Sequence, residues 1–163
     1  DLMRHLKTTV ALLLLLFFVF YMAYAYFLRS GGINEIYWHI EYGDKWVCKS
    51  TAVLVDNAPL SRYAQKKMWR RYSNVLLHKA PLLTSGCDTI VFLRNKTERA
   101  KDIGVTDYWV DDYQYCLNGA FGNKKCISKE EQLFVIQLRP SAEGDEKIGY
   151  IGKQPVYIHF ITF

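Results

Sequence analysis

Four cysteines are the residues of this sequence that point most directly to a chemistry. They are Cys48, Cys87, Cys116 and Cys126, and an even number of cysteines in an exported domain is typical of disulfide bonds. Cys116 and Cys126 enclose two glycines and two asparagines, which favour a tight turn, so we pair these two and assign Cys48 to Cys87 by elimination. Free thiols and a metal site are the alternatives, and against a metal the sequence has no C-x-x-C spacing and no His three to five residues from a Cys. We therefore expect two disulfides, no metal and no other cofactor.

Motifs that would indicate an enzyme are absent from the sequence. It has no G-x-S-x-G, H-E-x-x-H, G-x-G-x-x-G or P-loop pattern. His39 and His159 lie in apolar stretches and His78 near the end of a predicted helix, where a histidine is more often structural than catalytic. Asp111 and Asp112 are adjacent on a predicted strand and would point to opposite faces, whereas acid–base catalysis needs two carboxylates in one cleft. We expect no enzymatic activity; a small envelope enzyme that unites one of these aspartates with a histidine is the weakest alternative.

One face of a predicted helix is strongly basic. Arg62, Lys66 and Arg70 follow one another at four-residue spacing, and residues 61–79 contain no carboxylate. Like charges at this spacing repel one another, so the pattern needs an explanation. The face is either solvated, with carboxylate partners elsewhere in the domain, or a surface for an acidic protein partner or anionic lipid headgroups. The opposite face is apolar and is expected to pack on a sheet through Ala64, Met68, Trp69, Tyr72, Val75 and Leu76.

Near the start of the chain, residues 8–28 form an apolar segment without a charged side chain. As a helix this segment is about 31 Å long, close to the roughly 30 Å hydrocarbon core of a bilayer. Arg4 and Lys7 precede it and only Arg29 follows closely, which favours a cytoplasmic N-terminus. We predict a single-pass anchor in a bacterial inner membrane, with the rest of the chain in the periplasm.

A cleaved signal peptide is the alternative interpretation of the same segment. Ala23 and Ala25 fit the small-x-small pattern of a cleavage site after Ala25. The apolar run continues through Leu28 without a polar segment before that site, which favours an uncleaved anchor. Both interpretations export the remaining residues, in agreement with the four cysteines.

The composition indicates one folded domain behind the anchor. The chain has 163 residues, 15% of them aromatic and 23% charged, with a net charge of +5, which excludes a disordered protein. We divide it into a cytoplasmic tip and anchor (1–29), a short linker (30–34) and an extracytoplasmic domain (35–163).

An α+β fold is predicted for this domain. The helix is expected at 60–79, begun by Pro59 and stopped by Pro81. It would pack on a mainly antiparallel sheet of about seven strands. These strands are expected at 36–42, 45–55, 88–94, 108–116, 132–139, 147–151 and 156–163.

Several short motifs carry a resemblance to a known family. The stretch Val53–Pro59 before a helix with Trp69, and Tyr115-Cys116 followed by Lys125–Lys129, resemble a family of short, uncharacterised enterobacterial membrane proteins. That resemblance implies a single-pass anchor, a periplasmic domain and no assigned enzymatic activity. It also implies a likeness to immunity proteins that protect bacteria from toxins delivered into the periplasm.

The function expected from these features is that of a membrane-anchored periplasmic binding protein, in its most concrete form an immunity protein that occludes a toxin. A structural subunit of an inner-membrane complex is the alternative. Nucleic acid is not an expected partner, because the location is wrong and no basic and aromatic binding module is present.

Overall fold

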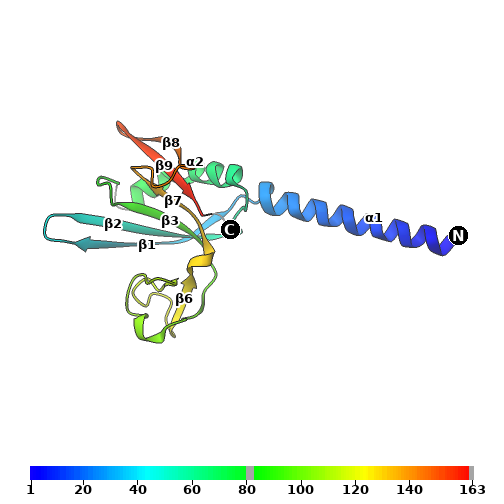
Figure 1. Ribbon diagram of the computed structural model, residues 1–163, viewed down its shortest axis with the longest axis horizontal. Coiled ribbons are helices and arrows are strands. Elements are labelled where there is room, and N and C mark those ends of the chain that lie inside the picture. Colours follow the sequence, from blue (N-terminus) through cyan, green and yellow to red (C-terminus); the bar gives the residue numbers. More distant parts are fainter. Residues whose placement is uncertain (80–82, 162–163) are drawn as a thin grey trace.

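An isolated helix and a mixed α+β domain make up the computed structural model, which describes residues 1–79 and 83–161. The helix α1 (Leu2–Ala23) ends in a π-helical turn, η1 (Tyr24–Leu28), and projects away from the domain (Figure 1). None of the residues of α1 is buried, and Leu2–Leu28 is long and apolar enough to cross a membrane. The apolar segment expected from the sequence is thus one continuous helical rod.

A six-stranded sheet forms the centre of the domain, in the order β1-β2-β3-β7-β9-β8. Its strands are β1 (Gly32–Tyr42), β2 (Val47–Asp56), β3 (Thr89–Arg94), β7 (Gln132–Gln137), β8 (Glu146–Ile151) and β9 (Gln154–Phe160). All neighbouring pairs of this sheet are antiparallel except β2 and β3, which run parallel. The parallel pair was not predicted; it arises because a helix, α2, connects the two strands and carries the chain back to the end where β2 began.

The helix α2 (Arg62–Lys79) covers one face of the sheet. The Ser61 hydroxyl accepts a hydrogen bond of 3.2 Å from the Ala64 amide and so caps its first turn. The predicted apolar face is confirmed for most positions, and the Trp69 ring meets Phe92 edge to face at 6.1 Å. Val75 is the exception, at 46% exposed, because it lies at the margin of the helix beside β1. The predicted stop at Pro81 lies outside the described residues.

A second layer covers the other face of the sheet. It contains a small sheet, in the order β4-β6-β5, and two short 3-10 turns. These elements are β4 (Glu98–Arg99), η2 (Ile103–Val105), β5 (Gln114–Tyr115), β6 (Lys125–Ser128) and η3 (Lys129–Glu131). Val53 and Val55 of β2 face α2, whereas Ala52 and Leu54 face the second layer. A sheet covered on both faces explains why the middle of β2 reads as a continuous apolar run.

The predicted strand at 108–116 is wrong for most of its length. The Asp111 carboxylate accepts hydrogen bonds from the backbone amides of Tyr113 (2.7 Å) and Gln114 (2.9 Å). This turn folds the chain back on itself, so that only residues 114–115 pair as a strand. The neighbouring β6 was not predicted, and the described strands form sheets of six and three members rather than one sheet of about seven.

The linker predicted at 30–34 is instead part of the domain. Gly32 is the first residue of β1, and Gly31 is buried with a φ of +68°. A Cβ atom at Gly31 would lie 2.4 Å from the Met68 sulfur, so the chain passes against α2 at a distance that only glycine allows. The Tyr72 hydroxyl also donates a hydrogen bond of 2.9 Å to the Gly31 carbonyl.

Hydrogen bonds also join the N-terminal helix directly to the start of α2. The amides of Leu60 and Ser61 donate to the carbonyls of Ala25 (3.1 Å) and Tyr26 (3.2 Å) in η1, the last turn of this helix. Ala25 itself is buried. These bonds use carbonyls that a helix end leaves unpaired, and they fix the direction in which the N-terminal helix leaves the domain.

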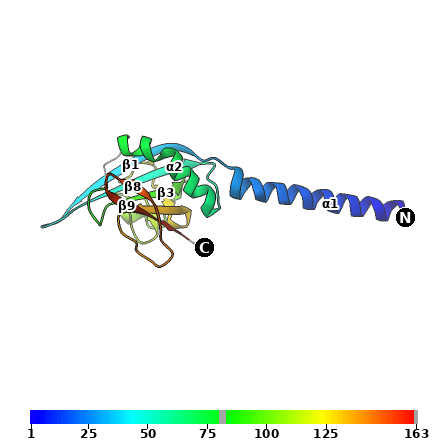
Figure 2. The same cartoon turned by 90° about the horizontal axis from the view of Figure 1, so that it is seen from above.

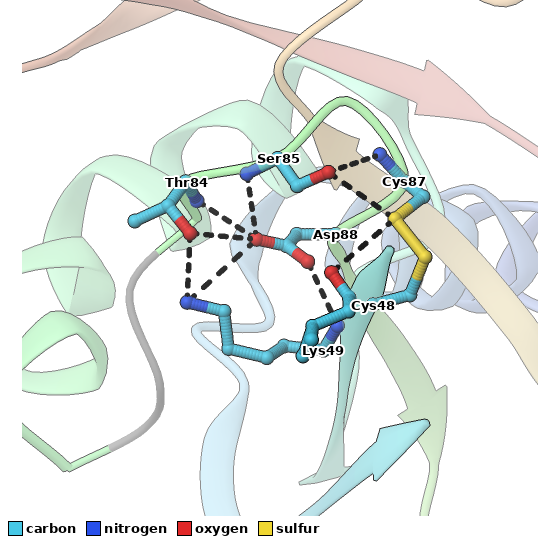
Figure 3. The surroundings of a disulfide bond; sticks show 7 residues. Cys48, Lys49, Thr84, Ser85, Cys87 and Asp88 are labelled. Carbon is cyan, nitrogen blue, oxygen red and sulfur yellow. Dashed lines mark hydrogen bonds and ion pairs between the residues drawn. A yellow bond between two sulfur atoms is a disulfide. The ribbon is translucent and has the colours of Figure 1, made fainter. Parts of the chain in front are cut away.

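Both predicted cysteine pairs are present as disulfides. Cys48 is joined to Cys87 with 5.4 Å between their Cα atoms, and Cys116 to Cys126 with 4.3 Å. The first bond ties the start of β2 to the loop before β3, and the second closes the turn ahead of β6 (Figure 3 shows the first).

A buried carboxylate lies beside the first disulfide (Figure 3). Asp88 accepts hydrogen bonds from the backbone amides of Lys49 (2.7 Å), Thr84 (2.8 Å) and Ser85 (2.8 Å), and the Lys49 ammonium is 3.8 Å away. Burial raises the pKa of the Asp88 carboxyl, but the three amides and the Lys49 charge outweigh it and hold the pKa below its usual value. Asp88 thus joins the β2 end to the loop that precedes β3.

Candidate binding surface

The three basic residues singled out on α2 make different contacts within the domain. The Lys66 ammonium pairs with the Glu146 carboxylate of β8 at 2.9 Å. The Arg62 guanidinium lies over the Phe160 ring, 5.1 Å from its centre. Arg70 is exposed further along the helix. Of the two interpretations, a carboxylate partner elsewhere in the domain therefore holds for Lys66, while Arg62 points toward the end of β9.

The edge strand β1 offers a different surface, which the sequence did not single out. It has 11 residues and pairs with β2 alone among the strands described. The Gly43 amide donates to the Trp46 carbonyl at 2.8 Å and closes the β1–β2 hairpin. In an antiparallel ladder, residue pairs that exchange main-chain hydrogen bonds alternate with pairs that do not, so counting from this bond Ile40 and Lys49 face each other without hydrogen bonds. The Lys49 amide instead donates to the Asp88 carboxylate, which agrees with this alternation.

This alternation leaves main-chain groups of β1 unpaired along the outer edge. Ile36, Trp38, Ile40 and Tyr42 turn their N–H and C=O groups away from β2. Their side chains share the face of the sheet on which α2 lies, because Ile36 packs into the core beneath that helix. An extended peptide laid along this edge would find both main-chain partners and an apolar row.

The two edges of the sheet differ in their protection against such pairing. The opposite edge, β8, is short, carries Lys147 and has a register shift between Lys147 and Gly149. Short length, lysine and bulges are common devices that prevent a strand from joining another. In β1 the register shifts only near its start, between Ile33 and Glu35, and is regular from there to Tyr42.

An open groove of about 700 Å³ runs beside β1, between this strand and α2. Ile36 and Trp38 line it from the strand, and Tyr72, Val75 and Lys79 from the helix. Trp38 is 55% exposed, although a tryptophan of this size is usually largely buried. The groove therefore combines exposed apolar surface with one cation, Lys79, and one carboxylate, Glu35.

Aromatic side chains continue this surface to the tip of the β1–β2 hairpin. Tyr42 is 77% exposed, and Trp46 and Val47 are also exposed. The hairpin extends beyond the other strands on the side opposite α1, in both views (Figure 1 and Figure 2). We call the row Ile36, Trp38, Ile40 and Tyr42, with its unpaired edge, the β1 edge; it carries exposed aromatic residues of the kind that dominate protein interfaces.

Asp111 and Asp112, the aspartates of the enzyme alternative, do not line a cavity with a histidine in the described part of the chain. The Asp111 carboxylate is used in its own turn. His39 stacks on Trp109 with 5.9 Å between ring centres, and the carboxylates that line the cavity of about 200 Å³ beside it are Glu41 and Asp107. Among the residues described, no three His, Cys, Asp or Glu side chains cluster as a metal site would require.

A partly buried hydrogen bond to a carboxylate accounts for the position of a further histidine, His159. The His159 ring nitrogen lies 2.6 Å from the Asp145 carboxylate. Burial raises the pKa of Asp145, but hydrogen bonds from Ser141, His159 and Ala142 lower it to about 2. This pair joins β9 to the loop before β8, which is a structural role.

Comparison with known proteins adds no relative to these observations: no family model, curated protein or solved structure matches this chain.

Proposed function

We propose that this chain is a membrane-anchored, extracytoplasmic binding protein whose β1 edge takes up an extended segment of a protein partner. In its most concrete form it is an immunity protein in the periplasm, and the partner is a delivered toxin that it occludes. The observation that carries the proposal is the regular, unprotected edge of β1 beside an open apolar groove.

The location rests on three features of the chain. The apolar helix suits a single membrane span, and the two disulfides suit an oxidising compartment. The cations Arg4 and Lys7 ahead of the span favour a cytoplasmic N-terminus and a periplasmic domain. An uncleaved anchor is supported by the hydrogen bonds at Ala25. Cleavage after Ala25 would separate the carbonyls of Ala25 and Tyr26, which together accept hydrogen bonds from the start of α2.

An extended segment is the occupant that matches the chemistry of the β1 edge. The N–H and C=O groups left at alternate residues bind water in the free protein and can pair with the main chain of an added strand, and the groove accepts the alternate apolar side chains of that strand. A second copy fits less well. β1 runs away from the anchor in both views (Figure 1 and Figure 2). The β1 strands of two copies in one membrane therefore point in the same direction, and they cannot pair with each other as antiparallel strands.

The proposal predicts that proline at Ile40 abolishes partner binding. Ile40→Pro removes an outward N–H without touching a bond to β2, and proline is tolerated on an edge strand. The variant loses one main-chain hydrogen bond, worth about 1 kcal/mol, and the proline ring also blocks the added strand. Calorimetry with the product of the adjacent toxin-type gene should therefore show an affinity at least tenfold lower. Tyr150→Pro is the matched control on the opposite edge, where Tyr150 faces Pro155, and should bind normally.

Equal binding by wild type and Ile40→Pro would refute the assignment of the edge. Unchanged survival of a deletion strain in competition with toxin-armed kin would refute the immunity role. Stable co-purification with inner-membrane proteins, in cells that meet no toxin, would favour the structural subunit instead.

A further inference from the structure

A pocket of about 320 Å³ lies at the end of the domain from which the anchor leaves. Tyr26 of the anchor, Arg62 and Gln65 of α2, Arg94 at the end of β3 and Gln132 at the start of β7 all line it. Figure 1 places the end of the described chain, which follows β9, at this same side. Residues far apart in sequence thus meet beside the last turn of the anchor.

The depth of this pocket relative to a bilayer follows from the anchor. The uncharged segment ends at Leu28, and Tyr26 belongs to its last turn. A span of about 30 Å that begins near residue 8 therefore ends near Leu28, within one turn of Tyr26, where the polar headgroups start. The hydrogen bonds from Leu60 and Ser61 to the anchor hold the pocket at that level.

Donors rather than acceptors dominate the polar groups of the pocket. Arg62 is held over Phe160 and, in the described part of the chain, makes no ion pair. Arg94 Nε is buried and donates a hydrogen bond to no described residue, although the Glu131 carboxylate is 3.6 Å away. Gln65 and Gln132 each donate one amide hydrogen, to the Pro59 carbonyl and the Tyr115 hydroxyl, and each retains a second.

The charges around the pocket leave an excess of cations. Glu131 is the acidic residue next to Arg94, and it is shared with the Lys96 ammonium at 3.8 Å. Lys96 also pairs with Glu98 at 4.0 Å, so Arg94 and Lys96 meet two carboxylates, and Arg62, which lines the pocket, adds a cation that pairs with no described carboxylate. Guanidinium groups bind phosphate in two-pronged geometry, and amide hydrogens supply the remaining bonds.

We propose that this pocket binds the phosphate of an anionic lipid headgroup. The inference rests on the membrane anchor of the proposed function but not on its protein partner. A bound headgroup would add a second attachment to the bilayer surface beside the anchor and would hold the β1 edge away from the membrane.

The test uses the full chain in a nonionic detergent, titrated with phosphatidylglycerol. We expect the melting temperature to rise with phosphatidylglycerol and much less with phosphatidylcholine, because a ligand that binds the folded state stabilises it. Arg62→Gln combined with Arg94→Gln should weaken the apparent affinity about thirtyfold, at the usual contribution of two cations near a lipid surface. Arg70→Gln combined with Lys153→Gln removes the same charge elsewhere and should leave the affinity unchanged.

Each arm of this experiment can overturn the proposal. Equal losses in the two double variants would show diffuse attraction rather than a site. A full shift with inorganic phosphate alone would make the site one for a soluble anion. If the pocket variant fails to fold, Arg62→Gln and Arg62→Lys replace it, and the proposal fails if glutamine binds as well as arginine. The location of the domain is tested separately, by the reporter fusions described below, so its failure is distinguishable.

Discussion

Replacing Cys48 and Cys87 together by serine is expected to lower the free energy of unfolding by about 4 kcal/mol. The bond closes a loop with a sequence separation of 39, and the entropy removed from the unfolded chain grows with loop length. Because a domain of this size is stable by only about 5–15 kcal/mol, this loss takes away much of the total. The measurement is chemical denaturation of the oxidised full chain in detergent, followed by far-ultraviolet circular dichroism.

The second disulfide provides the comparison. It has a sequence separation of 10, so serine at Cys116 and Cys126 should cost about 3 kcal/mol, less than the first pair. A larger loss for the second pair would contradict the order derived from loop length. Non-reducing peptide mapping of the wild type checks the pairing itself, and a Cys48–Cys116 peptide would show that the strand order is wrong.

The Asp88→Asn variant is expected to lose about 3 kcal/mol. The buried carboxylate accepts three backbone amides, and an asparagine side chain would turn an NH₂ group toward one of these donors and leave it unpaired. Removal of the negative charge also leaves the Lys49 ammonium without its partner. Asp112→Asn, at an exposed position, is the control and should stay within about 0.5 kcal/mol of wild type.

A pH titration tests the same group independently. The folded pKa of Asp88 lies below its usual value, so its contribution to stability is complete above the unfolded pKa near 4 and is lost as the pH falls through the folded pKa. Wild type should therefore lose stability faster than Asp88→Asn as the pH falls below about 4. Parallel pH profiles of the two proteins would show that the carboxylate is not held in its charged form.

Local patterns in the sequence predicted the features that depend on local physics. The uncharged run to Leu28 predicted the long apolar helix, and the glycines and asparagines between Cys116 and Cys126 predicted the shorter disulfide. The spacing of Met68, Trp69 and Leu76 gave the buried face of α2. Each of these follows from periodicity, hydrophobicity or turn propensity within one segment.

The remaining features depend on residues far apart in the chain. Alternation of Ile36, Trp38, Ile40 and Tyr42 indicates a strand, but only the strand order shows that this strand lies at an edge. The pocket lined by Arg62 and Arg94 brings together the start of α2 and the end of β3, and no short sequence pattern predicts a contact between residues so far apart in the chain. The turn at Asp111 was missed because its apolar neighbours resemble a strand while its carboxylate binds the backbone.

The location of the domain can be measured with two reporters fused in separate strains after Phe163. A reporter that is active only in the periplasm should be active, and a reporter that is active only in the cytoplasm should be silent, because Arg4 and Lys7 retain the N-terminus inside. The reverse pattern would place the cysteines in a reducing compartment and the β1 edge on the wrong side of the membrane for a delivered toxin, and would contradict the proposed function.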